Sequence, residues 1–189
     1  MKMNVKKIVW LSLMVLLWVA GALSVYSQST SEYDLKSSII YRICKYTKWP
    51  TPPDESKPFI ISILGKIPGG AEIKIPPELT MDKRKIRIRK ITQLTEINGS
   101  SVLFIASSEA YRLADILEYT HGKPILTVGD TRGFAQRGVM INFYIQNDRV
   151  RFEINYEAGK DASLQMHFQL STIGKVVKTR KSSGKDGEG

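Results

Sequence analysis

The sequence has few of the residues that most often carry enzyme chemistry. Its 189 residues include one cysteine, Cys44, and two histidines, His121 and His167. A single cysteine excludes a disulfide within the chain. The patterns HExxH, CxxC, GxGxxG and GxxxxGKS/T, which mark zinc, redox and phosphate-binding sites, are all absent. The sequence therefore predicts no catalytic residue, no metal site and no cofactor, and it favours a protein that is not an enzyme.

Acidic residues are missing from the first 27 positions, where lysines precede an apolar run over residues 8–25. Small residues at 20–22 follow the most apolar part of the run, and a polar stretch comes after it. This order is typical of a secretory signal peptide. A membrane-spanning helix of about 20 apolar residues is the alternative, and the small residues favour cleavage instead. We expect a signal peptide over residues 1–27, cut after Ala22 or Ser27, and an exported protein.

The formal charge of +10 comes in good part from the two ends of the chain. Residues 178–189 are rich in Lys, Ser and Gly and have no apolar side chain, which predicts a disordered basic tail. Residues 28–177 are mildly basic and long enough for one domain with its own core. Export and this modest charge argue against nucleic acid as a partner.

Hydrophobic periodicity predicts a single α/β domain, with a mixed sheet of about five or six strands flanked by helices. Helices are expected over residues 33–48 and 108–120, the second begun by a serine cap. Strands are expected over residues 59–64, 85–91, 102–106 and 125–128. Residues 65–80 are rich in Gly and Pro and fit no regular element.

Two residues near the end of the first helix have expected structural roles. Cys44 lies within the apolar periodicity of that helix, so it should be buried rather than reactive. Trp49 stands where the chain turns at Pro50. We expect it to pack beneath that corner.

The clearest local pattern is a β-hairpin over residues 139–156, with a helix after it. Asn147 and Asp148 accept positive φ in a two-residue turn. Folding about that turn pairs Phe143 with Phe152 and puts the apolar residues of both strands on one face. The other face holds the polar residues Asn142, Tyr144, Arg151 and Glu153. It is either a solvated face with cross-strand pairs or a recognition surface, and the pattern leaves both open.

A glycine-rich loop precedes the hairpin. Asp130 is expected to cap a one-turn helix that Gly138 ends with positive φ. Loops at the carboxyl edge of a sheet commonly carry binding sites, so the loop should expose its basic and aromatic side chains there. The predicted binding residues of loop and hairpin are Asp130, Arg132, Phe134, Arg137, Asn142, Arg151 and Glu153.

Three stretches together resemble the exported YfiR-like (HmsC-like) proteins. The first is YDLKSSIIYRICKYTKWP at residues 33–50, which ends in Trp-Pro. The second is VLFIASSE at residues 102–109. The third is PILTVGDTRGFAQRGVMINF at residues 124–143, continued by RFEIN at 151–155. Their order and spacing extend the resemblance over about residues 33–174.

The resemblance implies a regulatory protein of the periplasm. The similar proteins bind the outer portion of an inner-membrane diguanylate cyclase and hold it inactive, which restrains cyclic-di-GMP signalling and biofilm formation. An inner-membrane signalling protein is then the expected partner. Relatives under redox control carry several cysteines, so Cys44 alone implies that this control is lost. A periplasmic binder of a small ligand or an envelope polymer is the alternative function, and a homodimer also stays open.

Overall fold

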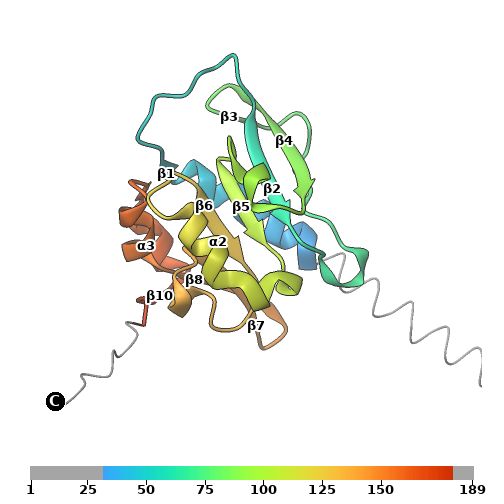
Figure 1. The fold of residues 1–189 in the computed structure, drawn as a ribbon, viewed down its shortest axis with the longest axis vertical. Coiled ribbons are helices and arrows are strands. Elements are labelled where there is room, and N and C mark those ends of the chain that lie inside the picture. Colours follow the sequence, from blue (N-terminus) through green and yellow to red (C-terminus); the bar gives the residue numbers. More distant parts are fainter. Residues whose placement is uncertain (1–31, 181–189) are drawn as a thin grey trace, which may run out of the picture.

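The computed structural model describes residues 32–180 (Figure 1). The expected signal peptide with its cleavage site lies outside these residues, as do residues 181–189 of the expected tail. Within the described part, no helix combines the length and the apolar character needed to span a bilayer.

A mixed eight-stranded sheet forms the centre of the domain, in the order β10-β8-β7-β6-β5-β2-β4-β3. Its parallel strands are β4 (Arg84–Ile91), β2 (Phe59–Leu64), β5 (Val102–Ile105), β6 (Leu126–Gly129) and β7 (Ile141–Gln146). The two edge strands are β3 (Thr80–Met81) and β10 (Lys175–Val176), and β8 (Arg149–Ile154) lies between β10 and β7. β3 is antiparallel to β4, β8 is antiparallel to β7, and β10 is parallel to β8. The predicted α/β class is confirmed, with extra strands because two-residue strands leave no period in a sequence.

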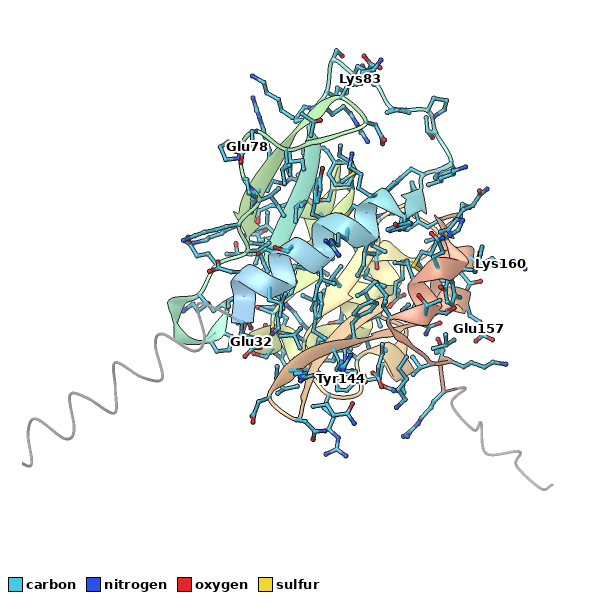
Figure 2. The ribbon with its side chains drawn as sticks, turned by 180° about the vertical axis from the view of Figure 1, so that it is seen from behind. Glu32, Glu78, Lys83, Tyr144, Glu157 and Lys160 are labelled. Carbon is cyan, nitrogen blue, oxygen red and sulfur yellow. The ribbon has the colours of Figure 1, made fainter. Side chains whose placement is uncertain are left out.

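Helices cover both faces of this sheet. The N-terminal helix, described from residue 32 to 45, lies across one face, as Figure 2 shows from behind. α2 (Leu113–Thr120) covers the opposite face (Figure 1). α3 (Tyr156–Asp161) follows the hairpin, as expected. The remaining elements are β1 (Thr47–Lys48), β9 (Gln165–Met166) and the 3₁₀ helices η1 (Pro68–Gly70), η2 (Leu94–Ile97), η3 (Ser107–Arg112), η4 (Ala135–Arg137) and η5 (Phe168–Thr172).

The central strand β5 divides the core into two halves. Its side chains alternate between the faces, and all four are fully buried. Val102 and Phe104 pack with the N-terminal helix, whereas Leu103 and Ile105 pack with α2. A strand covered on both faces is apolar throughout, which explains the unbroken run VLFI.

Both predicted helices differ from the structure at their ends. The first stops at Lys45, because residues 47–48 pair as β1 with β9 instead of extending the helix. The second begins as the 3₁₀ helix η3, which no side chain caps. The serine cap was a wrong prediction because Ser108 Oγ accepts a hydrogen bond from the backbone N–H of Lys66, 2.8 Å away, across the carboxyl edge of the sheet.

The hairpin has the predicted register. Phe143 pairs with Phe152, and their rings meet edge to face with centroids 6.2 Å apart. Asn147 and Asp148 have φ values of 51° and 55°, as a two-residue turn of this kind requires. The polar residues of both strands consequently share the face opposite these rings.

Cys44 and Trp49 also lie where they were expected. Cys44 is 1% exposed, and burial raises the pKa of its thiol to about 12. Trp49 is half-buried at the corner, with its ring edge to face against Phe59 and the centroids 5.3 Å apart. Both residues therefore serve the packing around the N-terminal helix.

Candidate functional site

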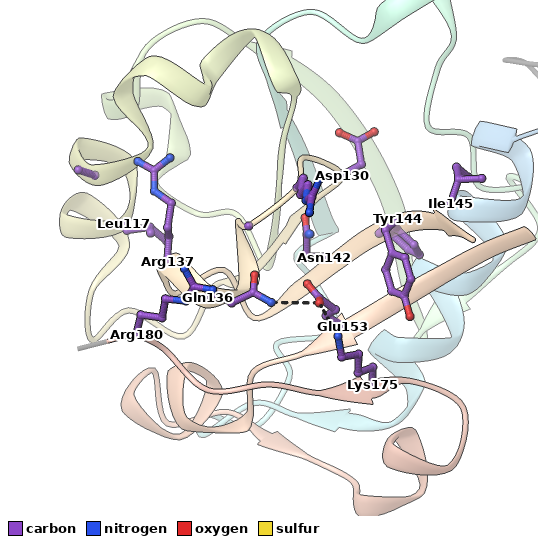
Figure 3. Close-up of a pocket in the computed structure, with 14 residues that line it drawn as sticks. Leu117, Asp130, Gln136, Arg137, Asn142, Tyr144, Ile145, Glu153, Lys175 and Arg180 are labelled. Carbon is purple, nitrogen blue, oxygen red and sulfur yellow. Dashed lines mark hydrogen bonds and ion pairs between the residues drawn. The ribbon is translucent and has the colours of Figure 1, made fainter. Parts of the chain in front are cut away.

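A groove of about 1120 Å³ lies between the loop after β6 and the polar face of the hairpin (Figure 3). We call it the hairpin groove. The loop contributes Asp130, Arg132, Gln136 and Arg137 to its lining. The hairpin contributes Asn142, Tyr144, Ile145 and Glu153. Leu117 of α2 and the C-terminal residues Lys175 and Arg180 complete the wall. Five of the seven predicted binding residues thus meet in one place.

Asp130 has a different role from the predicted helix cap. The short helix η4 begins five residues later, with Phe134 at its N-cap position. The Asp130 carboxylate instead accepts hydrogen bonds from the Tyr33 hydroxyl and from Lys36 Nζ, the latter at 2.8 Å. In this ion pair the Lys36 and Asp130 side chains are 4% and 5% exposed. The pair joins the N-terminal helix to the wall of the groove.

Two further interactions hold this buried pair in place. Lys36 Nζ also lies 2.7 Å from Glu32, one turn earlier on the N-terminal helix. The pKa of Tyr33 is raised mainly by burial and secondly by the negative charge of Asp130. The Tyr33 hydroxyl therefore keeps its proton and remains a hydrogen-bond donor. Asp130 therefore shares the Lys36 cation with Glu32 and gains a hydrogen bond from Tyr33 before any ligand or partner arrives.

Phe134 is buried, so the prediction of an exposed contact was wrong. It is 1% exposed and belongs to the core beneath α2. The space for its ring exists because residue 129 is a glycine: a Cβ there would lie 2.7 Å from the ring carbon Cδ2. Phe134 thus anchors the loop and leaves Arg132 and Arg137 exposed on either side.

Glu153 forms the floor of the groove together with Asn142, its partner across the hairpin. Its carboxylate accepts a hydrogen bond from Gln136 Nε2 at 3.0 Å and lies 3.6 Å from Lys175 Nζ. The side chain is 11% exposed. Arg151, which was expected to join this surface, is exposed and does not line the groove. Glu153 thus also faces a lysine.

Two features of the lining lack partners within the described residues. The guanidinium groups of Arg132 and Arg137 make no ion pair there. Asn142 is 1% exposed, yet its Oδ1 atom accepts no hydrogen bond from residues 32–180. Buried amide oxygens of this kind are rare because they lose hydration without replacement. Gln136 Oε1 is a second buried acceptor of the lining without a partner in the described part of the chain, so the groove combines positive charge with two unused acceptors.

Sequence reasoning missed Gln136, Lys175 and Arg180. β10 places Lys175 directly beside Glu153 on β8. The backbone N–H of Arg180 donates to the carbonyl of Gln136 at 2.8 Å, so the chain keeps contact with the loop up to the last described residue. No local pattern signals these pairings, because they join segments far apart in the sequence.

These features define a single-domain α/β protein with a basic groove on one side of its sheet. A profile of the YfiR/HmsC-like family matches residues 33–175, and the chain belongs to that family. The family consists of regulatory proteins, and the match confirms the resemblance found in the sequence. No curated protein matches the chain.

Proposed function

We propose that the protein is a periplasmic regulator without enzymatic activity, which binds an inner-membrane diguanylate cyclase from outside and holds it inactive. In this role it lowers cyclic-di-GMP and restrains biofilm formation. The family match over residues 33–175 carries this proposal, since it spans nearly all of the described domain. The signal-peptide pattern of residues 1–27 supports export to the compartment where such a partner exposes its outer portion.

The rim of the hairpin groove is the contact surface that we propose for this partner. Arg132 and Arg137 are exposed on a loop that Phe134 and the Lys36–Asp130 pair fix to the core. A loop held from below loses little conformational freedom when a partner binds. Charges at the rim of an interface mainly set the rate of association and the choice of partner. An acidic outer surface on the cyclase would suit this rim.

The carboxylates of the groove support a binding role over catalysis. A general acid or base has to exchange its proton with a reacting group within hydrogen-bond reach. Asp130 and Glu153 already face a lysine each, and one oxygen of each carboxylate, Oδ2 of Asp130 and Oε1 of Glu153, also accepts a hydrogen bond from a neighbouring side chain. Such carboxylates position the groups around them.

Cyclic-di-GMP measured in cells lacking the gene tests the proposed function. Complementation with the wild-type protein should lower the cyclic-di-GMP level, and Arg137→Glu should fail to do so. Arg87→Glu is the matched control, because Arg87 is exposed on β4 and its reversal changes the net charge equally. Cyclic-di-GMP that stays the same with and without the wild-type protein would contradict the proposal.

A further inference from the structure

We propose that the hairpin groove is a binding site for a small organic anion that carries a carboxylate or phosphate and, close to it, a hydroxyl or N–H donor. This inference does not depend on the cyclase partner. It rests on the charge of the groove, on its unpartnered buried acceptors and on its size.

The charges of the groove favour an anion. Asp130 shares Lys36 with Glu32, which does not line the groove, and Glu153 faces Lys175 and Gln136. Arg132 and Arg137 remain without an ion pair among residues 32–180. A guanidinium presents N–H groups in a planar fork that matches the two oxygens of a carboxylate or phosphate. The basic side chains therefore fit the anionic group of a ligand.

The unpartnered oxygens at the floor of the groove favour a ligand that also carries a hydrogen-bond donor. Asn142 Oδ1 and Gln136 Oε1 are buried acceptors without a partner in the described part of the chain. The orientation of the Gln136 amide is fixed, since its Nε2 atom donates to Glu153. An inorganic cation is disfavoured here by the neighbouring arginines, whereas a hydroxyl or N–H group would satisfy either oxygen.

The side chains that line the groove lie in different parts of it. Figure 3 shows Arg137 and Arg180 on one side of the groove, Asn142 and Glu153 in the middle, and Tyr144 on the other side. The volume of about 1120 Å³ is ample for a small molecule. The Asn142 and Gln136 oxygens are themselves buried, so these side chains have to shift slightly before a hydroxyl or N–H group of a small ligand can donate to one of them.

Isothermal titration calorimetry on the mature protein tests this inference with matched pairs of anions. Citrate and malate each carry a hydroxyl that tricarballylate and succinate lack. We expect the hydroxyl-bearing member of a pair to bind about tenfold more tightly, because only it satisfies a buried acceptor. Inorganic phosphate serves as the probe for the alternative anionic group. Sodium chloride at equal ionic strength controls for screening.

Three variants separate the site from nonspecific attraction. Arg137→Glu should weaken the binding of citrate about tenfold or more, and Asn142→Asp should do the same by adding a negative charge to the floor. Arg87→Glu should bind like the wild type. Circular dichroism verifies that each variant is folded.

Two results would overturn the inference. One is that none of these anions binds the wild type with a dissociation constant below about 10 mM. The other is that Arg137→Glu and Asn142→Asp, both folded, bind citrate as tightly as Arg87→Glu does. Binding of an acidic polypeptide such as polyglutamate alone would assign the groove to a macromolecular partner instead. None of these results depends on whether the protein regulates a cyclase.

Discussion

At the scale of single residues, the buried pair of Lys36 and Asp130 connects the fold to the groove. It joins the first described helix to the loop after β6, and both side chains are almost fully shielded from water. A buried charge is stable only while its partner remains, because the interior cannot hydrate it. This pair is therefore a sensitive test of the described geometry.

Replacing Lys36 by methionine should destabilise the protein by about 3–5 kcal/mol, because it leaves the buried Asp130 carboxylate without its cation. Equilibrium unfolding in urea measures this change. Lys57→Met is the control, since Lys57 pairs with Asp54 at 3.1 Å on the open surface, and it should leave the free energy of unfolding essentially unchanged. Equal effects of the two substitutions would contradict the buried pair.

Cys44 should resist alkylation in the folded protein. Burial raises the pKa of its thiol to about 12, so the reactive thiolate is scarce at pH 8 and the sulfur is shielded. Iodoacetamide labelling followed by mass spectrometry should detect modification only after denaturation. Rapid labelling of the native protein would place Cys44 at the surface.

At the scale of elements, the hairpin shows what a sequence can specify. Its register follows from residues that are neighbours along the chain: a turn pair with positive φ and an apolar residue at every second position. The groove, in contrast, is formed by contacts between segments that lie far apart in the sequence. Lys175 and Arg180 reach it through pairings with β8 and with Gln136, and Phe134 is buried because position 129 has no side chain. Such tertiary contacts leave no periodic signal, so these residues were missed or misplaced.

The turn of the hairpin should become more stable with glycine at its second position. Asp148 has a φ of 55°, which glycine adopts without the steric cost that a Cβ carries. Asp148→Gly should therefore stabilise the protein by about 0.5–1 kcal/mol, measured by thermal or urea unfolding. Asp148→Ala, which keeps the Cβ, should bring no such gain. A destabilised glycine variant would show that the turn has another conformation.

The aromatic pair beneath the hairpin should carry much of its stability. Phe152 is 4% exposed and packs edge to face on Phe143. Truncating it to alanine should cost about 3–5 kcal/mol, because the cavity cannot close within a packed sheet. If Phe152→Ala unfolds at the same urea concentration as the wild type, the two rings do not share a face.

At the scale of the whole molecule, the layers of the domain bring distant segments to one surface. The N-terminal helix fixes Asp130 from one side of the sheet, and the core beneath α2 fixes Phe134 from the other. The loop between these two anchors presents Arg132 and Arg137 to the outside. A rigid loop with free charges is suited to recognition, which agrees with membership of a regulatory family.

Direct binding to the outer portion of a membrane-bound diguanylate cyclase from the same cell tests the central claim most directly. Biolayer interferometry with the purified mature protein should detect a complex with the wild type and with Arg87→Glu. Arg137→Glu should weaken that complex about tenfold or more, since it reverses a charge at the proposed contact. A folded wild-type protein that binds no such cyclase would contradict the regulatory account, and full binding by Arg137→Glu would remove the groove from the contact surface.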